Sequence, residues 1–190
     1  MVQRVKAVPV SSYEASQSGT YRTGIRSVLA RPHPVLSLRA VEVDPCDPAI
    51  VALADALVAT MRVSPACCGL AAPQVGESVR VFCMDLTGHK KARSCAGLVV
   101  MVNPRIVDVS GSVTMREGCM SVPNLTGNVT RPRELVVEGA APGTGAIVRV
   151  FADEMEARCL LHEIDHLDGF VFVDRVENQR TDLFARKTFA

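Results

Sequence analysis

The sequence predicts an α+β fold, in which mixed or antiparallel β-sheets pack around a helix near the C-terminus and another helix lies toward the N-terminus. Three observations support this prediction. Helical periodicity appears over residues 48–62 and again over residues 153–167, and the stretch between them holds short runs rich in β-branched residues. Strands in the middle of a chain with helices at both ends favour α+β over alternating βαβ units.

The first helix is expected over residues 48–62. Six apolar residues recur there at helical spacing, namely Ile50, Leu53, Ala54, Leu57, Val58 and Met61. Asp47 stands just before Pro48, and this order is typical of an N-cap residue followed by proline in the first helical turn. We therefore expect one amphipathic helix that begins at Pro48.

The middle of the chain is expected to form short strands separated by turn residues. The expected strands are Val79–Leu86, Leu98–Asn103, Arg105–Val109, Leu135–Glu138 and Ile147–Phe151. Glycine, proline and asparagine stand between them, as at Thr87-Gly88, Asn103-Pro104 and Pro142-Gly143.

The second helix is expected from Asp153 to about Leu167. Asp153 is followed three residues later by Glu156, which resembles a capping box with Asp in the usual place of Ser or Thr. Gly169 suits the left-handed turn that commonly ends a helix.

Composition is that of an ordinary globular protein and argues against two kinds of partner. The 190 residues are 48% hydrophobic and 22% charged with a net charge of +1, which gives no electrostatic case for direct nucleic-acid binding. An aromatic content of 4% without Trp argues against base-stacking platforms. No apolar run approaches the roughly 20 residues of a membrane helix, so we expect no membrane partner. The oligomeric state stays open.

Residues 1–26 differ in composition from the rest, with four basic residues against a single acid and several Ser. This composition faintly resembles an organellar transit peptide. We favour an N-terminal extension followed by a single domain over residues 27–190. The seven cysteines, an odd number spread through apolar stretches, indicate mostly reduced thiols and a cytoplasmic protein.

A candidate metal site lies in the second helix, where residues 162–166 read His-Glu-Ile-Asp-His. Residues four apart lie about 40° apart around a helix, so both imidazoles can reach one ion. Glu163 is offset by about 100° from His162, which suits a base acting on water activated by the ion. The bare pattern also arises by chance on surface helices. Met155 and Cys159 share the histidines' face, however, and this apolar start favours inward-pointing imidazoles that need partners.

A third ligand is needed, because catalytic metal sites usually have three protein ligands and one open position. The candidate is Cys119, within the segment Glu117–Pro123. Gly118 and Pro123 argue for irregular backbone at the edge of a strand, which can turn a thiolate toward the helix. From spacing alone, any of the seven cysteines can serve.

A further segment, Gly69–Gly76, combines small residues with one amide side chain. Small residues allow a substrate backbone to approach closely. The amide of Gln74 can donate a hydrogen bond to a carbonyl oxygen or to the oxyanion that replaces it. The alternative interpretation is a tight loop with a surface Gln.

These three segments, in this order, resemble the peptide deformylase family. Its motifs GxGxAAxQ, EGCxS and HExDH are matched by residues 67–74, 117–121 and 162–166. Cys67 stands where the family has the first glycine of the first motif, which puts the backbone path into that loop in doubt. This departure touches no candidate ligand, so we expect activity to survive.

The resemblance implies removal of the formyl group from the N-terminal formyl-methionine of newly made polypeptides, at the ribosome, with release of formate. It also implies one divalent ion, with ferrous iron as the usual native ion and zinc, nickel or cobalt as substitutes. The implied ligands are Cys119, His162 and His166. Glu163 is the implied general base, and the Gln74 side chain and the Met120 backbone N–H are the implied oxyanion donors. Arg131 is implied to steady Glu117.

The methionine side chain of such a substrate needs an apolar pocket. From their positions relative to the motifs, Met115, Met155 and Cys159 are expected to line it, with Gly69 admitting the substrate backbone. Arg158 is expected near the mouth. Ordinary core packing is the alternative for each of the pocket residues.

Two other functions stay open. A zinc peptidase with an HExxH helix would use a different third ligand and cleave internal peptide bonds. A non-catalytic module would use the ion for structure and close the site with a fourth protein ligand. The candidates for that ligand are Cys67, Cys68, Cys159 and His89. Glu163 and Gln74 argue against a structural site, which needs neither.

Overall fold

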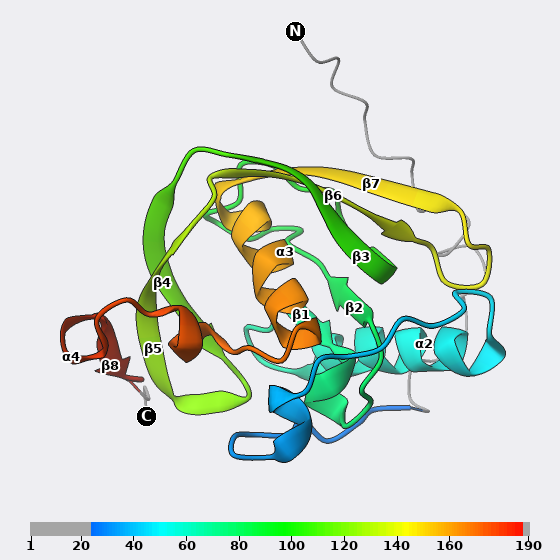
Figure 1. Ribbon diagram of the computed structural model, residues 1–190, viewed down its shortest axis with the longest axis horizontal. Helices are drawn as coiled ribbons and strands as arrows, with labels where there is room; N and C mark the ends of the chain where they lie inside the picture. Colours follow the sequence, from blue (N-terminus) through cyan, green and yellow to red (C-terminus); the bar gives the residue numbers. More distant parts are fainter. Residues whose placement is uncertain (1–23, 188–190) are drawn as a thin grey trace, which may run out of the picture.

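The computed structural model describes residues 24–187, whose elements form two β-sheets around the helix α3 (Figure 1). The expected extension over residues 1–26 lies almost wholly outside the described residues. The helices are α2 (Pro48–Val63), α3 (Glu154–Leu167) and α4 (Gln179–Asp182), with short 3-10 turns η1 (Pro34–Ser37), η2 (Ala72–Val75) and η3 (Phe172–Arg175). The strands are β1 (Gly69–Ala71), β2 (Val81–Met84), β3 (Val99–Ser110), β4 (Val113–Cys119), β5 (Val122–Arg131), β6 (Glu134–Ala140), β7 (Ile147–Asp153) and β8 (Leu183–Ala185).

Both sheets are antiparallel. One has the strand order β1-β2-β3-β6-β7 and the other the order β4-β5-β8. In Figure 1, α3 lies between the long β3-β6-β7 part of the first sheet and the β4-β5 hairpin. The predicted α+β class is therefore confirmed. Strands β1 and β4 are each at the edge of their sheet, and this places two free edges near α3.

The short strands β2 and the first part of β3 are buried on both faces, which explains their continuous apolar sequences. Successive side chains of a strand point to opposite faces of the sheet. Phe82 and Met84 accordingly pack in the core with α3, whereas Val81 and Cys83 pack in the core with α2. The two helices thus cover opposite faces of this part of the sheet, and α3 is held in place by buried apolar contacts.

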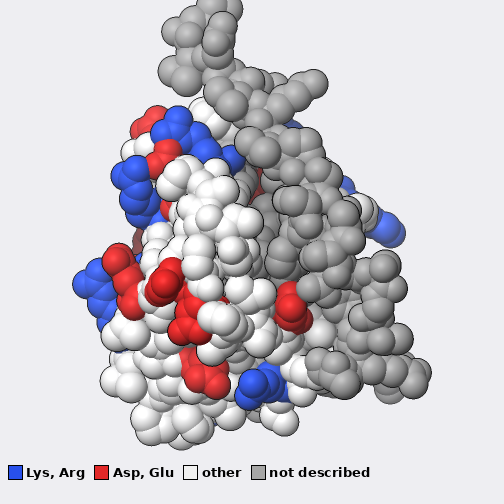
Figure 2. Space-filling model, turned by 90° about the vertical axis from the view of Figure 1, so that its right-hand side faces the viewer, with Lys and Arg blue, Asp and Glu red and all other residues white. Residues whose placement is uncertain are grey.

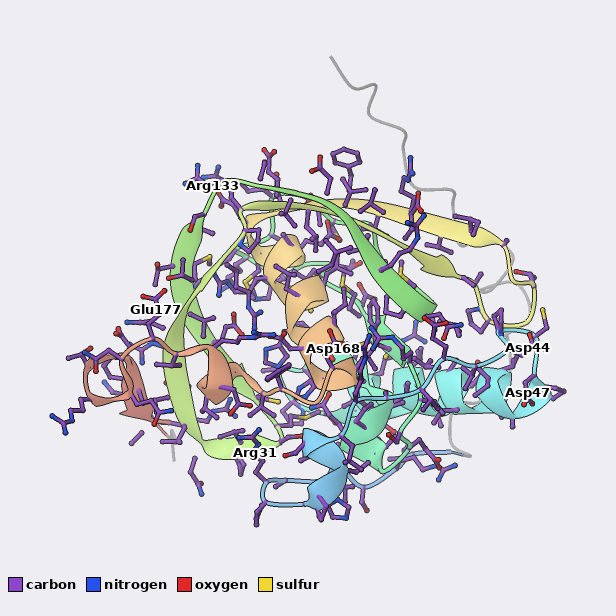
Figure 3. All side chains as sticks on the ribbon, viewed as in Figure 1. Arg31, Asp44, Asp47, Arg133, Asp168 and Glu177 are labelled. Carbon is purple, nitrogen blue, oxygen red and sulfur yellow. The ribbon has the colours of Figure 1, made fainter. Side chains whose placement is uncertain are left out.

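Helix α2 begins and ends within one residue of the prediction. Asp47 is its N-cap, and its Oδ1 accepts a hydrogen bond from the Ala49 N–H at 2.8 Å, with Pro48 following in the first turn (Figure 3). The apolar residues predicted to face the core are buried. The predicted amphipathic helix is confirmed.

Helix α3 matches its predicted range, but the predicted capping box is wrong. The side chain of Asp153 makes no capping hydrogen bond and accepts one from the Ser94 N–H at 3.1 Å. Glu156 accepts from the Ser94 hydroxyl and the Ala96 N–H, both at 2.6 Å. Both carboxylates therefore accept hydrogen bonds from the loop before β3 and do not cap the helix. At the other end, Gly169 has φ of +83°, as the prediction of a left-handed turn requires.

The strand predictions differ from the structure in two ways. The ranges Leu98–Asn103 and Arg105–Val109 are one strand, β3, because the chain passes Asn103 at φ of +51° with a register shift and no turn. Strands β1, β4, β5 and β8 were missed. β1 and β8 have three residues each, which is too few for a periodic signal. In β4 and β5 the exposed positions are mostly polar and few side chains are buried, so the apolar signal is weak.

One face of the described part of the protein shows the balance of charges expected from the composition. On the face seen in Figure 2, visible Lys and Arg side chains are interspersed with Asp and Glu. Within residues 24–187, none of the helices has the length and apolar character needed to cross a membrane.

Candidate metal centre

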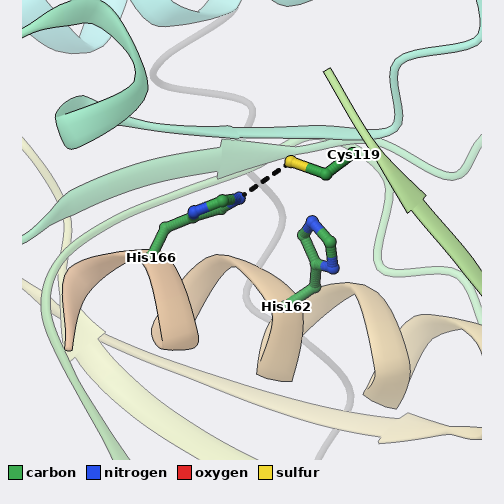
Figure 4. Close-up of side chains that lie close together, drawn as sticks. All are labelled: Cys119, His162 and His166. Atoms are coloured by element: carbon green, nitrogen blue, oxygen red, sulfur yellow. Dashed lines mark hydrogen bonds between the residues drawn. The ribbon is translucent and has the colours of Figure 1, made fainter. Parts of the chain in front are cut away.

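Two histidines of α3 and one cysteine of β4 converge inside the protein (Figure 4). Sγ of Cys119 lies 3.2 Å from Nε2 of His166, and the rings of His162 and His166 have centroids 5.0 Å apart. One nitrogen of each ring and the sulfur all lie within 4.8 Å of one another. The spacing of four residues on α3 brings the two imidazoles to one side, as predicted from sequence.

The position of Cys119 depends on an irregularity at the end of β4. The pairing with β5 runs regularly from Val113 to Gly118 and then shifts register, so that Cys119 is opposite Val122. This bulge ends the strand at the cysteine and turns its buried thiol toward α3. The sequence prediction of irregular backbone at a strand edge is confirmed.

The electrostatics of this cluster favour a thiolate. Burial alone opposes ionisation, but His166 and His162 donate to the sulfur and place positive charge beside it. Together they hold the pKa of the Cys119 thiol well below its usual value. In the same way, hydrogen bonds with Cys119 and Glu117 outweigh burial and raise the pKa of His162 well above its usual value.

Glu117 orients His162 from behind. Nδ1 of His162 lies 2.9 Å from Oε2 of Glu117, which leaves the opposite ring nitrogen toward Cys119. Arg131 donates to both carboxylate oxygens of Glu117, at 2.6 and 3.0 Å. Although Glu117 is buried, these donors hold its pKa well below the usual range. The contact with Arg131 is the one that the family resemblance implied.

Two further residues complete this network: Asp165, which had no role assigned from the sequence, and Arg158, which was expected near the mouth of the pocket. Asp165 of α3 accepts hydrogen bonds from Arg131 at 2.8 Å and from Arg175 at 2.6 Å. It therefore links η3, which ends at Arg175, to the helix. The position of Asp165 between the two histidines in the sequence could have marked it as a residue of the site. Arg158 donates to Glu117 and to the carbonyl oxygens of Val129 and Val113.

Glu163 is buried, with 2% of its surface exposed, and its Oε2 has no hydrogen-bond partner among residues 24–187. Burial raises the pKa of Glu163 to about 7, even though the charges of His162 and His166 act in the opposite direction. A buried carboxyl with an unused oxygen and a pKa near neutrality can accept and release a proton at physiological pH.

Gln74 reaches the same cluster from η2. Its Nε2 lies 3.4 Å from Sγ of Cys119 and donates to the Ser121 hydroxyl at 3.1 Å, while its Oε1 accepts from the Ala71 N–H at 3.0 Å. The side chain is buried, so the alternative of a surface Gln is wrong. Three hydrogen-bonding contacts hold the amide beside the cysteine.

A cavity of about 430 Å³ opens onto these residues. It is lined by Pro65–Gly69, Gln74, His89, Arg116–Met120, Met155, Arg158, Cys159, His162, Glu163 and Arg186. Among the predicted pocket residues, Gly69, Met155 and Cys159 line the cavity and Met115 does not. Arg158 also lines it, but its side chain is 2% exposed and is held by Glu117, so the prediction that Arg158 lies near the mouth is wrong.

Arg116, Arg186 and Cys67 line the cavity although they were not predicted to line the pocket, and of these three only Arg186 is distant from the three motifs. Arg116 lies on β4, and Arg186 follows the last strand β8, which pairs with β5. Cys67 lines the cavity too, and its thiol donates to the Gly69 carbonyl at 3.0 Å. No pattern in the sequence connects Arg186 with β4, because their proximity depends on the pairing of β8.

The donor set fits a divalent transition-metal ion. Thiolate and imidazole are the ligands that such ions prefer among protein side chains. The cluster has three donors within residues 24–187, and Glu117 supplies the hydrogen bond that usually orients a histidine ligand. Cys67, Cys68, Cys159 and His89 are not part of the cluster, so the described residues provide no fourth ligand.

Comparisons with known proteins identify the family of the chain. The model of a family described as polypeptide deformylase matches residues 25–182. A peptide deformylase of Syntrophobacter fumaroxidans is 38% identical over 163 residues, which cover 86% of this chain and 93% of that protein. Peptide deformylase 2 of Streptomyces coelicolor is 43% identical over 148 residues, covering 77% of this chain and 80% of that protein.

The structural comparison gives the same result. The crystal structure of peptide deformylase from Ehrlichia chaffeensis has a TM-score of 0.75 and 33% identity, covering 82% of this chain and 90% of that chain. A Met-Ala-Ser bound crystal structure of class I type b peptide deformylase from Acinetobacter baumannii has a TM-score of 0.71 and 33% identity, covering 80% and 98% of the two chains.

Proposed function

The chain belongs to the peptide deformylase family, whose members remove the N-formyl group from nascent peptides, and we propose that its own residues perform this reaction in the cavity beside α3. The observation that carries the proposal is the buried oxygen of Glu163 without a partner among the described residues, next to three convergent metal donors.

We assign Cys119, His162 and His166 as the ligands of one divalent ion. Their donor atoms already lie within 4.8 Å of one another, and the thiolate form of Cys119 is favoured by its two neighbours. We propose ferrous iron as the native ion, with zinc, nickel or cobalt as substitutes, because a thiolate with two imidazoles accepts all of them. When bound, the ion supplies Lewis-acid chemistry, which makes water more acidic and a carbonyl more electrophilic.

Glu163 is the proposed general base and acid. It accepts a proton from the attacking water, whose oxygen forms a bond to the formyl carbon. When the carbon–nitrogen bond breaks, Glu163 returns that proton to the leaving amine, and the products are formate and a free N-terminus. Its pKa of about 7 suits both halves of this transfer.

Gln74 and Met120 are the proposed hydrogen-bond donors to the oxyanion. The Gln74 amide is held beside Cys119 by hydrogen bonds at both of its ends, and Met120 lines the cavity directly after Cys119. A preorganised amide and a backbone N–H can stabilise the charge that develops on the formyl oxygen. Glu117 and Arg131 keep His162 oriented from behind.

The substrate's methionine side chain is proposed to lie against Met155 and Cys159, which line the cavity from α3. Its backbone is proposed to pass between Gly69 of β1 and Gly118 of β4, two strands with free edges. Arg158 and Met115 are not retained as substrate contacts, since the first is committed to Glu117 and the second lies outside the lining. The solved Acinetobacter baumannii relative with Met-Ala-Ser supports a short methionyl peptide as the ligand class.

We further propose residues 27–190 as a single catalytic domain and residues 1–26 as an extension, which the family match over residues 25–182 supports. Action on formyl-methionyl nascent peptides at the ribosome and a cytoplasmic location are proposed on the same basis.

The test is formate release from formyl-Met-Ala-Ser by metal-loaded protein purified without oxygen. We expect turnover by the wild type and a loss of at least about a thousandfold in the Glu163→Gln variant, because general acid–base catalysis contributes on this order. The matched control is Glu177→Gln, which removes an exposed carboxylate and leaves turnover unchanged. Cleavage of a blocked internal peptide without formate release would favour a zinc peptidase instead.

A further inference from the structure

The cavity lined by two of the three metal donors, Cys119 and His162, has a basic rim. Its lining includes two acids, Glu117 and Glu163, and both are buried. The two exposed charged residues in the same lining, Arg116 and Arg186, are both arginines. The charge presented to an entering ligand is therefore positive, although the whole chain has a net charge of only +1.

Arg186 is delivered to this rim by the last strand. β8 pairs antiparallel with β5, and the Arg186 N–H continues the ladder by donating to the Asn124 carbonyl at 2.9 Å. The side chain then lies over Gly118 of β4. A Cβ atom built at Gly118 would come within 3.4 Å of Cζ of Arg186 and still closer to its Nη2. Because Gly118 lacks a side chain, the guanidinium can lie beside the strand that carries Cys119.

Arg116 lies two residues before Gly118 on the same strand and is held by neutral groups alone. Its guanidinium donates to Asn128 at 3.1 Å and to Thr126 at 3.1 Å, and it stacks over the ring of Phe184 from β8 at 3.5 Å. These contacts fix its position but do not neutralise its charge. Among residues 24–187, no carboxylate pairs with either Arg116 or Arg186, whereas the buried arginines of the site, Arg131 and Arg158, pair with Glu117 or Asp165.

We propose that Arg116 and Arg186 form a carboxylate-binding subsite for the part of the substrate that follows formyl-methionine. This inference rests on the proposed function, and it adds a preference among substrates. An extended peptide advances about 3.3 Å per residue, so a peptide lying along β4 from Cys119 passes Arg116 after about 10 Å. The carboxylate then belongs to the second or third residue of the peptide.

The subsite would bind the same chemical group from two sources. One is an acidic side chain at the second or third position, which a nascent chain can present. The other is the C-terminal carboxylate of a very short peptide. Arginine suits either source, because its planar guanidinium can donate two hydrogen bonds to one carboxylate.

The experiment compares kcat/KM for matched peptides, all of which end in a C-terminal amide except one free acid. Formyl-Met-Ala-Glu is paired with formyl-Met-Ala-Gln, formyl-Met-Glu-Ala with formyl-Met-Gln-Ala, and formyl-Met-Ala-Ala free acid with its own amide. We expect wild-type protein to prefer the Glu peptide of at least one pair by about three- to tenfold, mainly through KM, since exposed ion pairs have modest strength. A preference confined to the free acid would assign the subsite to the C-terminal carboxylate and overturn the side-chain form of the proposal.

Variants Arg186→Gln and Arg116→Gln should bring the ratio of the paired kcat/KM values toward 1. The matched control is Arg180→Gln, which removes an exposed arginine of α4 that does not line the cavity and should leave the ratio as in the wild type. Raising the salt concentration to about 0.5 M should weaken the preference of the wild type. Equal use of every pair by the wild type, or a ratio that survives both substitutions, would overturn the subsite. Failure to release formate from any peptide would instead reject the proposed function.

Discussion

Gly69 and Glu163 are in such close contact that a side chain at Gly69 would occupy the place of the carboxyl group. A Cβ atom built at Gly69 would lie 2.8 Å from Cδ of Glu163 and still closer to its Oε1. Because Gly69 has no side chain, the carboxyl group of Glu163, the proposed general base, can lie directly against β1. The sequence suggested that small residues here admit a substrate, and the structure adds this second reason for glycine.

Gly69→Ala is expected to displace the Glu163 carboxyl and to lower kcat by at least about tenfold, because small displacements of a catalytic group are costly to the rate. Metal content should be unchanged, since neither Gly69 nor Glu163 is a proposed ligand. Formate release and metal analysis on the same preparation check this. A Gly69→Ala variant with wild-type kcat would show that the carboxyl's position is not critical.

Arg158→Met is expected to destabilise the protein by about 2–3 kcal/mol, because Glu117 and the carbonyls of Val129 and Val113 lose a buried donor while Arg131 still pairs with Glu117. The same change should weaken metal binding by about tenfold or more, since Glu117 orients His162. Urea unfolding measures the first effect and competition with a chelator measures the second. Unchanged metal affinity in a folded variant would show that Arg131 suffices to hold Glu117.

The activity is expected to depend on pH through Glu163. Its pKa of about 7 means that the carboxylate, the form able to accept a proton, is lost as pH falls below that value. A plot of kcat/KM against pH should therefore decrease on the acid side with an apparent pKa near 7, in a range where the protein stays folded. A flat profile from about pH 5 to 8 would contradict the assigned role.

The same shift predicts how stability changes in the Glu163→Gln variant. The folded-state pKa is raised from 4.5 to about 7, so ionisation costs stability as pH rises through this window. The Gln side chain stays neutral. In metal-free protein, the free energy of unfolding of the Glu163→Gln variant should exceed that of the wild type. The difference should be small below pH 4.5 and grow to roughly 3 kcal/mol above pH 7. Unfolding by urea at several pH values measures this difference.

Removal of the metal should abolish formate release, and ferrous iron or a substitute ion should restore it. Cys119→Ser is expected to weaken binding of the ion, because a hydroxyl replaces the soft thiolate that His162 and His166 favour. Cys95→Ser, at an exposed cysteine outside the cavity, is the matched control. Equal metal content in the two variants would argue against Cys119 as a ligand.

The elements with a strong periodic signal were predicted well. Helix α2 is indicated by its apolar spacing and by Asp47-Pro48. Helix α3 is indicated by its helical periodicity and by Gly169. Strand β4 was missed even though it carries Cys119, because its exposed positions are polar and its pairing partner supplies its stability. Asn103-Pro104 resembles a turn, yet the Asn103 side chain exchanges hydrogen bonds with the backbone of Val43 and the strand continues.

By itself, the sequence determined the chemistry available at the site. Helical spacing places His162, Glu163 and His166 within one turn and a half, and this relation is local, since it follows from the backbone geometry of a single helix. The motif resemblance at residues 117–121 implied Cys119 as the third donor, and the tertiary structure brings its thiol to those histidines. The tertiary structure alone decided that Arg158 pairs with Glu117 and that Arg186 lies over Gly118. Each of these contacts joins residues far apart in the chain, so it depends on sheet register and helix packing, which no local pattern of residues records.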